Sequence, residues 1–375
     1  MIDVLFLIHD LSVGGAEKVL VNLVNHMNKE KFNVTVLSLF DEGVNKEFLG
    51  DDIIYKYAFK KAIRGNSHLM KLFTPQYLYK MIVKDEYDIV ISFLEGPSTR
   101  VVSGCLNDNT KIVSWVHSTI RTDNELSASF RSFKEAYACY SSNDKIVFVS
   151  EDTKKAFLNV CPLKDKALVL YNTNESDEII KKSKEVIEDF YFKNDTFYWC
   201  GVGKLVDNKG FDRMIRIQNK LISEGYKVEL IILGVGPKES ELVELCELKG
   251  VSNSVHFLGY KKNPYKYIAK CNLFVCASHS EGFSTAATES LIVGTPICTV
   301  DVSGMKEMLG KKNEYGLIVN NNEEDLYFGI KKLLDDKELL ATYREKTFIR
   351  KKIFSTSSTV KSVENMLINL VEDKI

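Results

Sequence analysis

The alternation of short apolar runs with longer amphipathic stretches is the feature that most constrains how this chain folds. The expected strands are continuously apolar and rich in Val and Ile, which is typical of strands buried on both faces of a parallel sheet. Between the first two, at residues 4–8 and 34–40, the stretch 16–28 places its apolar residues on one helical stripe. A strand, a helix and a strand in this order predict a βαβ unit.

The alternation runs through the chain twice, and a charged stretch at residues 173–195 separates the two series. The expected strands are at residues 4–8, 34–40, 53–58, 89–93, 112–116, 146–149 and 168–171, and then at 197–202, 228–233, 255–258, 273–277, 296–300 and 316–319. At roughly 100–200 residues per domain, the length also suggests two domains. We therefore predict an α/β fold of two Rossmann-like, doubly wound parallel-sheet domains that face a cleft, with ligands beyond the carboxyl ends of the strands.

The domain boundaries follow from the same pattern. We expect an N-terminal domain at residues 1–173, a linker region with a solvated helix at 174–196, and a C-terminal domain at 197–355. Residues 356–375 include a last helix with its apolar residues on one side, which we expect to pack back toward the N-terminal domain.

Composition excludes several classes of protein. A formal net charge of −1 gives no global basic field for nucleic acid. The eight cysteines include no Cys-x-x-Cys pair, so we expect no zinc site and interpret them as buried thiols in a reducing compartment. Residues 1–10 show no positive leader, and no apolar run reaches the ~20 residues of a membrane-spanning helix. We therefore expect a cytoplasmic protein.

Glycine-flanked loops follow the first strand of each expected domain. Gly14 and Gly15 allow the backbone to approach an anion at a helix start, although an ordinary strand-to-helix turn would also explain them. In the second domain, Lys204 and Lys209 precede a helix, where they can neutralise phosphate charge or can be plain solvated lysines. The chain contains no Gly-x-Gly-x-x-Gly fingerprint, which argues against a Rossmann dehydrogenase.

A third loop, after the expected strand 273–277, holds two carboxylates eight residues apart. We place Glu281 in the loop, where Gly282 permits a tight turn, and Glu289 on the following helix. Glu289 has apolar neighbours, so its ionised carboxylate needs a partner such as a ribose diol. The backbone amides of Ser284 and Thr285 at the helix N-terminus predict an anion site.

Six motifs in register resemble glycosyltransferase family 4, a family of retaining enzymes with the GT-B fold. The most specific is Glu-x7-Glu from Glu281 to Glu289, followed by Ser-Leu-Ile-Val-Gly-Thr-Pro at 290–296. The others are Gly-Gly-Ala-Glu at 14–17, Gly-Lys-Leu at 203–205 with Lys-Gly at 209–210, Leu-Gly-Val-Gly-Pro at 233–237 and Phe-Leu-Gly at 257–259. The resemblance spans nearly the whole chain and extends to bacterial capsule and exopolysaccharide enzymes.

The resemblance implies a hexosyltransferase that moves a sugar from a nucleotide-sugar, most commonly a UDP-sugar with GDP as the rival, to a saccharide acceptor. The acceptor would be lipid-linked and the setting bacterial surface polysaccharide synthesis. By resemblance, Glu289 binds the donor ribose, Glu281 contacts the transferred sugar, and Lys204 and Lys209 hold the diphosphate. The remaining donor contacts implied are Gly14, Gly15, Tyr260, Gly282, Phe283, Ser284 and Thr285. No cofactor and no metal is implied, and the chain contains no Asp-x-Asp.

Three residues of the first domain are further candidates. The resemblance implies that His117, after the expected strand 112–116, orients a hydroxyl near the sugar and is catalytic; a histidine that caps a strand end is the alternative. Glu95 and Arg100 are candidate acceptor contacts or parts of a surface turn. Two departures from the family are Lys204, where arginine with its bidentate fork is common, and Asn172-Thr173, where the family often has Asn-Pro or Asn-Gly.

Residues 53–84 contain no Asp or Glu. The segment mixes basic and aromatic residues, namely Lys56, Lys60, Lys61, Arg64, Lys71, Lys80 and Lys84 with Tyr55, Tyr57, Phe59, Phe73, Tyr77 and Tyr79. This mixture suits an anionic lipid surface, although a basic face over core aromatics would also produce it. We predict that the segment docks the first domain on the inner membrane leaflet as a peripheral protein.

Two other functions remain open from the sequence. A nucleotide-sugar epimerase of the same fold would need no acceptor, and a two-lobed sugar-binding protein would close on a sugar without reaction.

Overall fold

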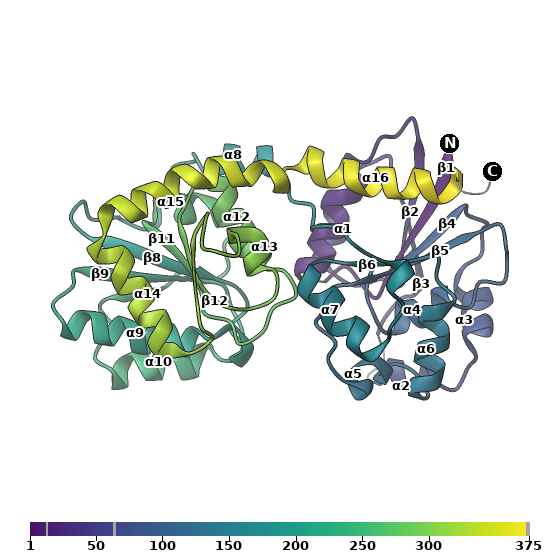
Figure 1. Cartoon of the computed structure of the whole chain (residues 1–375), viewed down its shortest axis with the longest axis horizontal. Coiled ribbons are helices and arrows are strands. Elements are labelled where there is room, and N and C mark those ends of the chain that lie inside the picture. The colour runs from purple at the N-terminus through teal and green to yellow at the C-terminus, as the bar shows by residue number, and fades with distance from the viewer. Residues whose placement is uncertain (13, 63–64, 373–375) are drawn as a thin grey trace. The chain divides into compact units, whose positions relative to one another are not determined.

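The computed structural model describes residues 1–12, 14–62 and 65–372 of the chain. The chain forms two compact units: unit 1 contains Met1–Asn174 and Thr356–Ile375, and unit 2 contains Glu175–Ser355 (Figure 1). Each unit is built on one parallel sheet covered by helices. The predicted α/β fold with two Rossmann-like domains is therefore confirmed.

The sheet of unit 1 has seven parallel strands, with β1 between β2 and β4. Its strands are β1 (Ile2–Ile8), β2 (Phe32–Phe40), β3 (Ile54–Phe59), β4 (Ile89–Ser92), β5 (Lys111–Val116), β6 (Lys145–Phe148) and β7 (Ala167–Val169). Their order across the sheet is β3-β2-β1-β4-β5-β6-β7, and Val4 of β1 pairs with Val34 of β2 and Ile89 of β4. Residues 4–8 are fully buried, as expected of an apolar run with strands on both sides.

Helices cover both faces of this sheet. They are α1 (Gly15–His26), α2 (Asn66–Met70), α3 (Pro75–Ile82), α4 (Pro97–Val102), α5 (Asp123–Ser127), α6 (Phe133–Ser141), α7 (Glu151–Val160) and α16 (Thr356–Glu372), with short 3-10 turns at Val44–Phe48 and Lys164–Lys166. α1 and α16 lie together on one face, whereas α3, α4 and α6 lie on the other (Figure 1). The Asn28 N–H at the end of α1 donates to Glu364 Oε1 of α16 at 2.6 Å, which fastens the last helix to this unit.

Unit 2 repeats the plan with β8 in the centre. Its strands are β8 (Phe197–Val202), β9 (Val228–Leu233), β10 (Val255–Phe257), β11 (Leu273–Cys276), β12 (Ile297–Val300) and β13 (Leu317–Val319), in the order β10-β9-β8-β11-β12-β13. Its helices are α8 (Ser176–Lys182), α9 (Phe211–Ser223), α10 (Glu239–Leu248), α11 (Tyr265–Lys270), α12 (Thr285–Val293), α13 (Met305–Leu309), α14 (Glu323–Asp335) and α15 (Lys337–Arg350), with 3-10 turns at Asp207–Lys209 and Lys351–Phe354. No helix within the described residues is long and apolar enough to cross a membrane.

Of the predicted linker region 174–196, residue 174 belongs to unit 1 and residues 175–196 are part of unit 2. Ile179 of α8 is buried and packs with Tyr265 and Ile292. Farther along, Lys193 Nζ lies 2.6 Å from Glu229 Oε1. The many charged residues of this stretch therefore cover the unit, and only one face of α8 is solvated.

Both sheets reverse their strand order at the first strand of the unit. In such sheets the crevice beyond the carboxyl ends of the two strands at the reversal is where ligands bind. The strands concerned are β1 and β4 in unit 1 and β8 and β11 in unit 2. The loops that follow these strands contain most of the residues that the sequence singled out.

Candidate active site

Lys209 and Glu281 form an ion pair beyond the carboxyl ends of β8 and β11. Lys209 Nζ lies 2.6 Å from Glu281 Oε1, and the Ser278 hydroxyl donates to the same oxygen at 2.7 Å. The two side chains are 29% and 10% exposed, so the pair lies at the rim of the unit. A ligand that reaches this rim meets a cation and a carboxylate already held in place.

The loops around this pair are packed backbone against backbone. Gly210, at the N-cap of α9, has φ +67°, and a Cβ there would lie 2.1 Å from the Ala277 carbonyl oxygen. Gly234 has φ +141°, and its Cβ would lie 1.9 Å from the Gly203 carbonyl oxygen. Neither position accepts a side chain without displacing the neighbouring loop. The loops after β8, β9 and β11 therefore form one layer.

Lys204 and Tyr260 lie on two loops of this layer. Lys204 is exposed, and no ion pair of its side chain is present within the described residues. Tyr260 is 63% exposed and follows Gly259, whose carbonyl accepts the Gly234 N–H at 2.9 Å. Both side chains are open to a ligand at the same rim, as the predicted diphosphate and base contacts require.

Glu289 lies on α12 and is 5% exposed. The Tyr265 hydroxyl donates to its Oε1 at 3.4 Å. α12 begins at Thr285, and the Ser284 hydroxyl caps it by accepting the Ala287 N–H at 3.3 Å. The backbone amides of residues 283–285 thus lie at the start of a nine-residue helix, where the helix dipole favours an anion.

Phe283 and Gly282 complete the turn into this helix. The Phe283 side chain is buried, and its ring lies 5.7 Å from that of Phe354. Gly282 is half-buried between Phe283 and Glu281. The buried ring holds the turn in place, and the polar groups that the turn offers to a ligand are its backbone amides.

A second polar cluster, which sequence reasoning missed, lies beside the ion pair. Arg213 of α9 donates to Asn321 Oδ1 at 2.8 Å and lies 2.6 Å from His279 Nδ1 through Nη2. The His279 N–H donates to the Asn208 carbonyl at 2.8 Å. Arg213 and Asn321 are 108 positions apart, so no local motif joins them; Ser278, three residues before Glu281, could have been found from its spacing.

In unit 1, Gly14 forms the N-cap of α1 and Gly15 is its first residue. A Cβ at Gly14 would lie 2.0 Å from Glu17 Oε2, so the Glu17 carboxylate folds back over this helix start. Burial raises the pKa of Glu17, and the nearby Asp10 charge adds to the rise. A hydrogen bond with His9 is the main cause that lowers the pKa of Asp10 to about 2. The anion site expected here is thus lined by carboxyl groups.

His117 follows β5 and is joined to Glu95, because its backbone N–H donates to Glu95 Oε2 at 2.8 Å. Burial is the main cause that lowers the pKa of the His117 imidazole to about 4, against the opposing charge of Glu95. The ring is therefore neutral at pH 7. Its Nε2 atom is buried and has no hydrogen-bond partner within the described residues. A buried polar atom without a partner is exceptional in a folded protein, and a bound ligand hydroxyl would satisfy it.

Arg100 is not an exposed contact. Its side chain is 1% exposed and forms an ion pair with Glu135 at 2.9 Å, and Nη1 and Nη2 donate to the Met70 and Phe73 carbonyls at 2.7 and 2.6 Å. Burial acts to raise the pKa of Glu135, but hydrogen bonds from Arg100 and from the Arg131 backbone hold it below its usual value. Arg100 has no exposed donor for a saccharide, so the expected acceptor role is corrected to a structural one.

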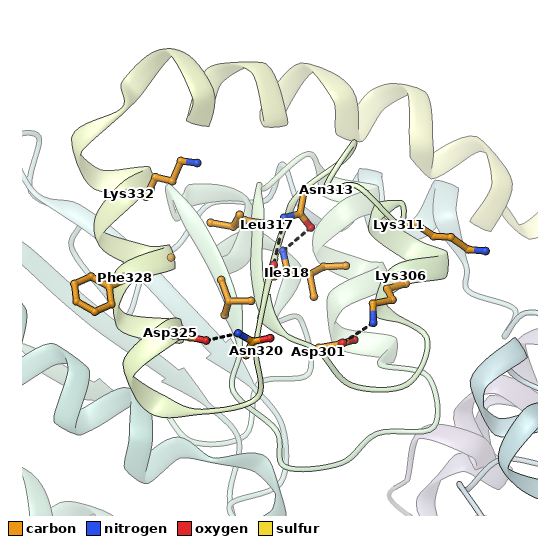
Figure 2. Close-up of a pocket in the computed structure, with 12 residues that line it drawn as sticks. Asp301, Lys306, Lys311, Asn313, Leu317, Ile318, Asn320, Asp325, Phe328 and Lys332 are labelled. Atoms are coloured by element: carbon orange, nitrogen blue, oxygen red, sulfur yellow. Dashed lines mark hydrogen bonds and ion pairs between the residues drawn. The ribbon is translucent and has the colours of Figure 1, made fainter.

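An open cavity of about 580 Å³ lies beside β13 and α14 in unit 2 (Figure 2). Two of its charged groups form an ion pair, because Lys306 lies 2.5 Å from Asp301 Oδ2, and Asn320 Nδ2 donates to Asp325 at 2.6 Å. None of the residues predicted for the site lines it. Within the described residues, no group of three or more His, Cys, Asp or Glu could hold a metal ion.

Comparisons with known proteins identify the family of the chain. The family model described as "Glycosyltransferase Family 4" matches residues 13–173, and that described as "Glycosyl transferases group 1" matches residues 175–350. One curated relative is the Campylobacter jejuni N-acetylgalactosamine-N,N'-diacetylbacillosaminyl-diphospho-undecaprenol 4-alpha-N-acetylgalactosaminyltransferase, 29% identical over 92% of this chain and 94% of the relative. Another is the Staphylococcus aureus capsular polysaccharide biosynthesis glycosyltransferase CapM, 26% identical over 56% of each chain.

Solved structures show the same fold over the whole chain. Anabaena HepE in complex with UDP superposes with a TM-score of 0.77 at 16% identity, covering 98% of this chain and 100% of that one. Staphylococcus aureus TarM gives a TM-score of 0.73 at 14% identity, again over 98% and 100%. The architecture is that of the GT-B glycosyltransferases. The chain itself belongs to glycosyltransferase family 4, so the family, the fold and the enzyme class predicted from the sequence are confirmed.

Proposed function

We propose that this glycosyltransferase uses a UDP-sugar donor, needs no metal ion and transfers the sugar with retention of its anomeric configuration to a lipid-linked saccharide. The observation that carries the donor assignment is the rim of unit 2, where exposed Lys204, the Lys209–Glu281 pair and the start of α12 lie on one layer of loops. Two cations and a helix N-terminus are a natural diphosphate site. HepE, which shares the fold, binds UDP and UDP-glucose.

Each donor contact then has a physical task. Lys204 and Lys209 neutralise the diphosphate and stabilise the charge that develops as the sugar leaves, assisted by the amides at the start of α12. Glu289 accepts hydrogen bonds from the ribose hydroxyls, which offsets the burial of its carboxylate. Tyr260 flanks the base, and Glu281 holds a hydroxyl of the transferred sugar.

The acceptor side of the proposal rests on unit 1. The neutral His117 ring can form a hydrogen bond with a sugar hydroxyl through Nε2, because that atom has no partner within the described residues. Glu95 holds the backbone of His117 and acts as a positioning residue. The lipid-linked character of the acceptor is supported by the Campylobacter jejuni relative, whose name specifies a diphospho-undecaprenol substrate.

Calorimetric titration of UDP and GDP into the purified protein tests the donor assignment. We expect UDP to bind, the Lys209→Ala variant to bind it far more weakly, and Lys249→Ala, which removes an exposed lysine at the end of α10, to bind as the wild type does. Absence of nucleotide binding by folded protein would refute the donor site. Addition of EDTA should leave transfer unchanged, and the anomeric proton of the product reports retention by NMR.

A further inference from the structure

The corner between α2 and α3 exposes large apolar side chains. Leu69, Leu72, Phe73 and Tyr77 are 49%, 73%, 41% and 54% exposed, and we call these four the apolar tip. Single exposed apolar residues are common on any protein surface. Four within residues 69–77 form a concentrated patch, which is typical of an interaction surface.

Exposed lysines precede and follow the apolar tip in the sequence. On α3, Leu78 and Ile82 are buried, whereas Tyr77 and Lys80, three residues apart, lie on the exposed face. Lys84 follows one turn later, and its Nζ donates to the Lys80 carbonyl at 3.2 Å. Lys60 and Lys61 are also exposed. Asp85 and Glu86 directly follow Lys84, but none of these four lysines forms an ion pair within the described residues. The charge and the apolar surface together complement an anionic lipid layer.

The structure shows which residues of the segment 53–84 are available as a membrane-binding surface. Lys56 is paired with Asp85 at 2.6 Å, and the Tyr55 hydroxyl donates to Asp41 Oδ1 at 3.1 Å. Tyr79 packs against the core of unit 1. Arg64 lies outside the described residues. Tyr57 and Phe59 of β3 are also 44% and 39% exposed, but the most exposed apolar side chain of the segment, Leu72 at 73%, lies at the corner between α2 and α3.

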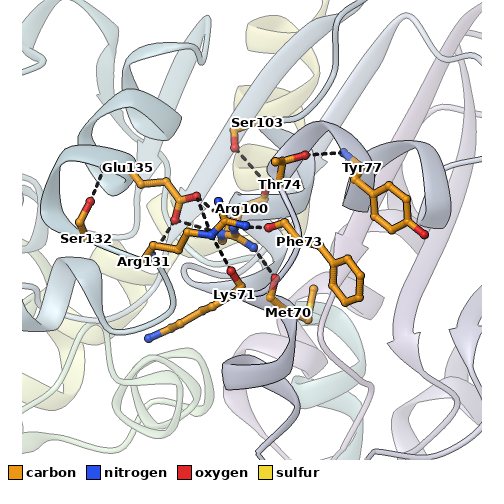
Figure 3. Close-up of polar contacts among 10 residues, drawn as sticks. All are labelled: Met70, Lys71, Phe73, Thr74, Tyr77, Arg100, Ser103, Arg131, Ser132 and Glu135. Carbon is orange, nitrogen blue, oxygen red and sulfur yellow. Dashed lines mark hydrogen bonds and ion pairs between the residues drawn. The ribbon is translucent and has the colours of Figure 1, made fainter.

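Arginine side chains hold the backbone of this corner in place (Figure 3). Arg100 donates to the Met70 carbonyl at 2.7 Å and the Phe73 carbonyl at 2.6 Å, while Arg131 Nε donates to the Lys71 carbonyl at 2.5 Å. Glu135 holds Arg100 through an ion pair at 2.9 Å. The turn is thus fixed from inside, and the rings of Phe73 and Tyr77, stacked 5.2 Å apart, point away from the arginines.

We propose that this corner is a preformed membrane-binding element, in which the apolar tip enters an anionic bilayer surface and Lys80, Lys84, Lys60 and Lys61 contact its headgroups. A rigid tip loses little conformational entropy when it inserts, because its backbone is already ordered. Arg100 and Arg131 are positioning residues for the tip. The inference deepens the proposed function by placing the enzyme at the surface that holds a lipid-linked acceptor, and it depends on that function only for the acceptor.

Sedimentation with vesicles of phosphatidylcholine, with and without phosphatidylglycerol, tests the proposal without any donor or acceptor. We expect binding only to the anionic vesicles at low salt. Leu72→Glu should weaken it by about tenfold or more, since a leucine leaves the apolar layer and a like charge enters. Leu248→Glu changes an 80% exposed leucine at the end of α10 and should leave binding unchanged.

Insertion of the apolar tip into a bilayer can be measured separately by tryptophan fluorescence. A tryptophan at the tip, Leu72→Trp, should shift its fluorescence to the blue on addition of anionic vesicles, whereas Leu248→Trp should not shift. Trp115 and Trp199 are buried and give a constant background. Unchanged emission from Leu72→Trp, or wild-type vesicle binding by Leu72→Glu, would overturn the proposal.

Arg131→Ala tests the positioning role. Its side chain is 43% exposed, so the fold tolerates the change. We expect faster amide exchange in residues 70–74 and several-fold weaker vesicle binding, with recovery in Arg131→Lys, which retains a donor for the Lys71 carbonyl. Calorimetry with UDP on the same samples separates this result from a failure of the donor site, because UDP binding should not change.

Discussion

Removal of either member of the Lys209–Glu281 pair should change UDP binding in opposite directions. In the structure Lys209 Nζ lies 2.6 Å from Glu281 Oε1, so a diphosphate that binds Lys209 must compete with this carboxylate. Loss of Lys209 removes a charged hydrogen bond to phosphate, worth about 1.5–3 kcal/mol, or about 10- to 150-fold in affinity. Loss of Glu281 instead removes the carboxylate that competes with the diphosphate for Lys209, so UDP binding should not weaken.

The gain from Glu281→Ala can be bounded. A partly exposed ion pair contributes up to about 1 kcal/mol, so UDP should bind Glu281→Ala as well as wild type or up to about fivefold more tightly. Sugar transfer should nevertheless fall by about 100-fold or more, because Glu281 is expected to act on the transferred sugar, and removal of one such electrostatic contact costs at least this much. The assay therefore needs two readouts, calorimetry with UDP and turnover of the UDP-sugar.

Matched controls are available in the same unit. Glu247→Ala and Lys249→Ala remove exposed charges of α10 and should change neither readout. If Glu281→Ala weakened UDP binding as strongly as Lys209→Ala, the pair would be a structural element of the loops. The competition argument would then be wrong.

Three further predictions concern single residues. Glu289→Gln should bind UDP about tenfold more weakly and should lose the preference for UDP over 2′-deoxy-UDP, which calorimetry measures, because we expect the Glu289 carboxylate to accept hydrogen bonds from the ribose hydroxyls. His117 is favoured neutral in the folded state, so its contribution to stability is present above about pH 6.5 and is lost as pH falls toward 4; the difference in Tm between wild type and His117→Gln should therefore shrink between pH 7 and pH 5. Glu135→Ala leaves the buried Arg100 guanidinium unpaired and should lower the free energy of unfolding by about 3–5 kcal/mol in urea titration, whereas unchanged stability would show that Arg100 finds another partner.

The central strands could be predicted from the sequence because a strand that is buried on both faces of a sheet consists of an unbroken run of apolar residues. The run at residues 4–8 marks β1, and the predicted strand 53–58 differs from β3 by one residue. Short helices leave no such signal: α2 and α13 have five residues each, too few for a periodic stripe to repeat.

The candidate site was predictable where chemistry is local and was not where it depends on distant partners. Glu281 and Glu289 lie in one loop and the helix after it, so their spacing placed them correctly. Arg100 looked like a polar residue after a strand, but Glu135 and the carbonyls of residues 70 and 73 surround it in the fold. A sequence motif contains no information about those contacts.

The two units share a strand order but differ in the charges at the position beyond the carboxyl ends of their central strands. In unit 2 that position holds Lys204, Lys209 and the start of α12, which together favour a diphosphate. In unit 1, the neutral His117 after β5 lies at this edge of the sheet with Glu95 after β4 and Glu17 of α1, and these groups can form hydrogen bonds with hydroxyls. Under the proposed function, this difference in charge favours the nucleotide-sugar donor on unit 2 and the saccharide acceptor on unit 1.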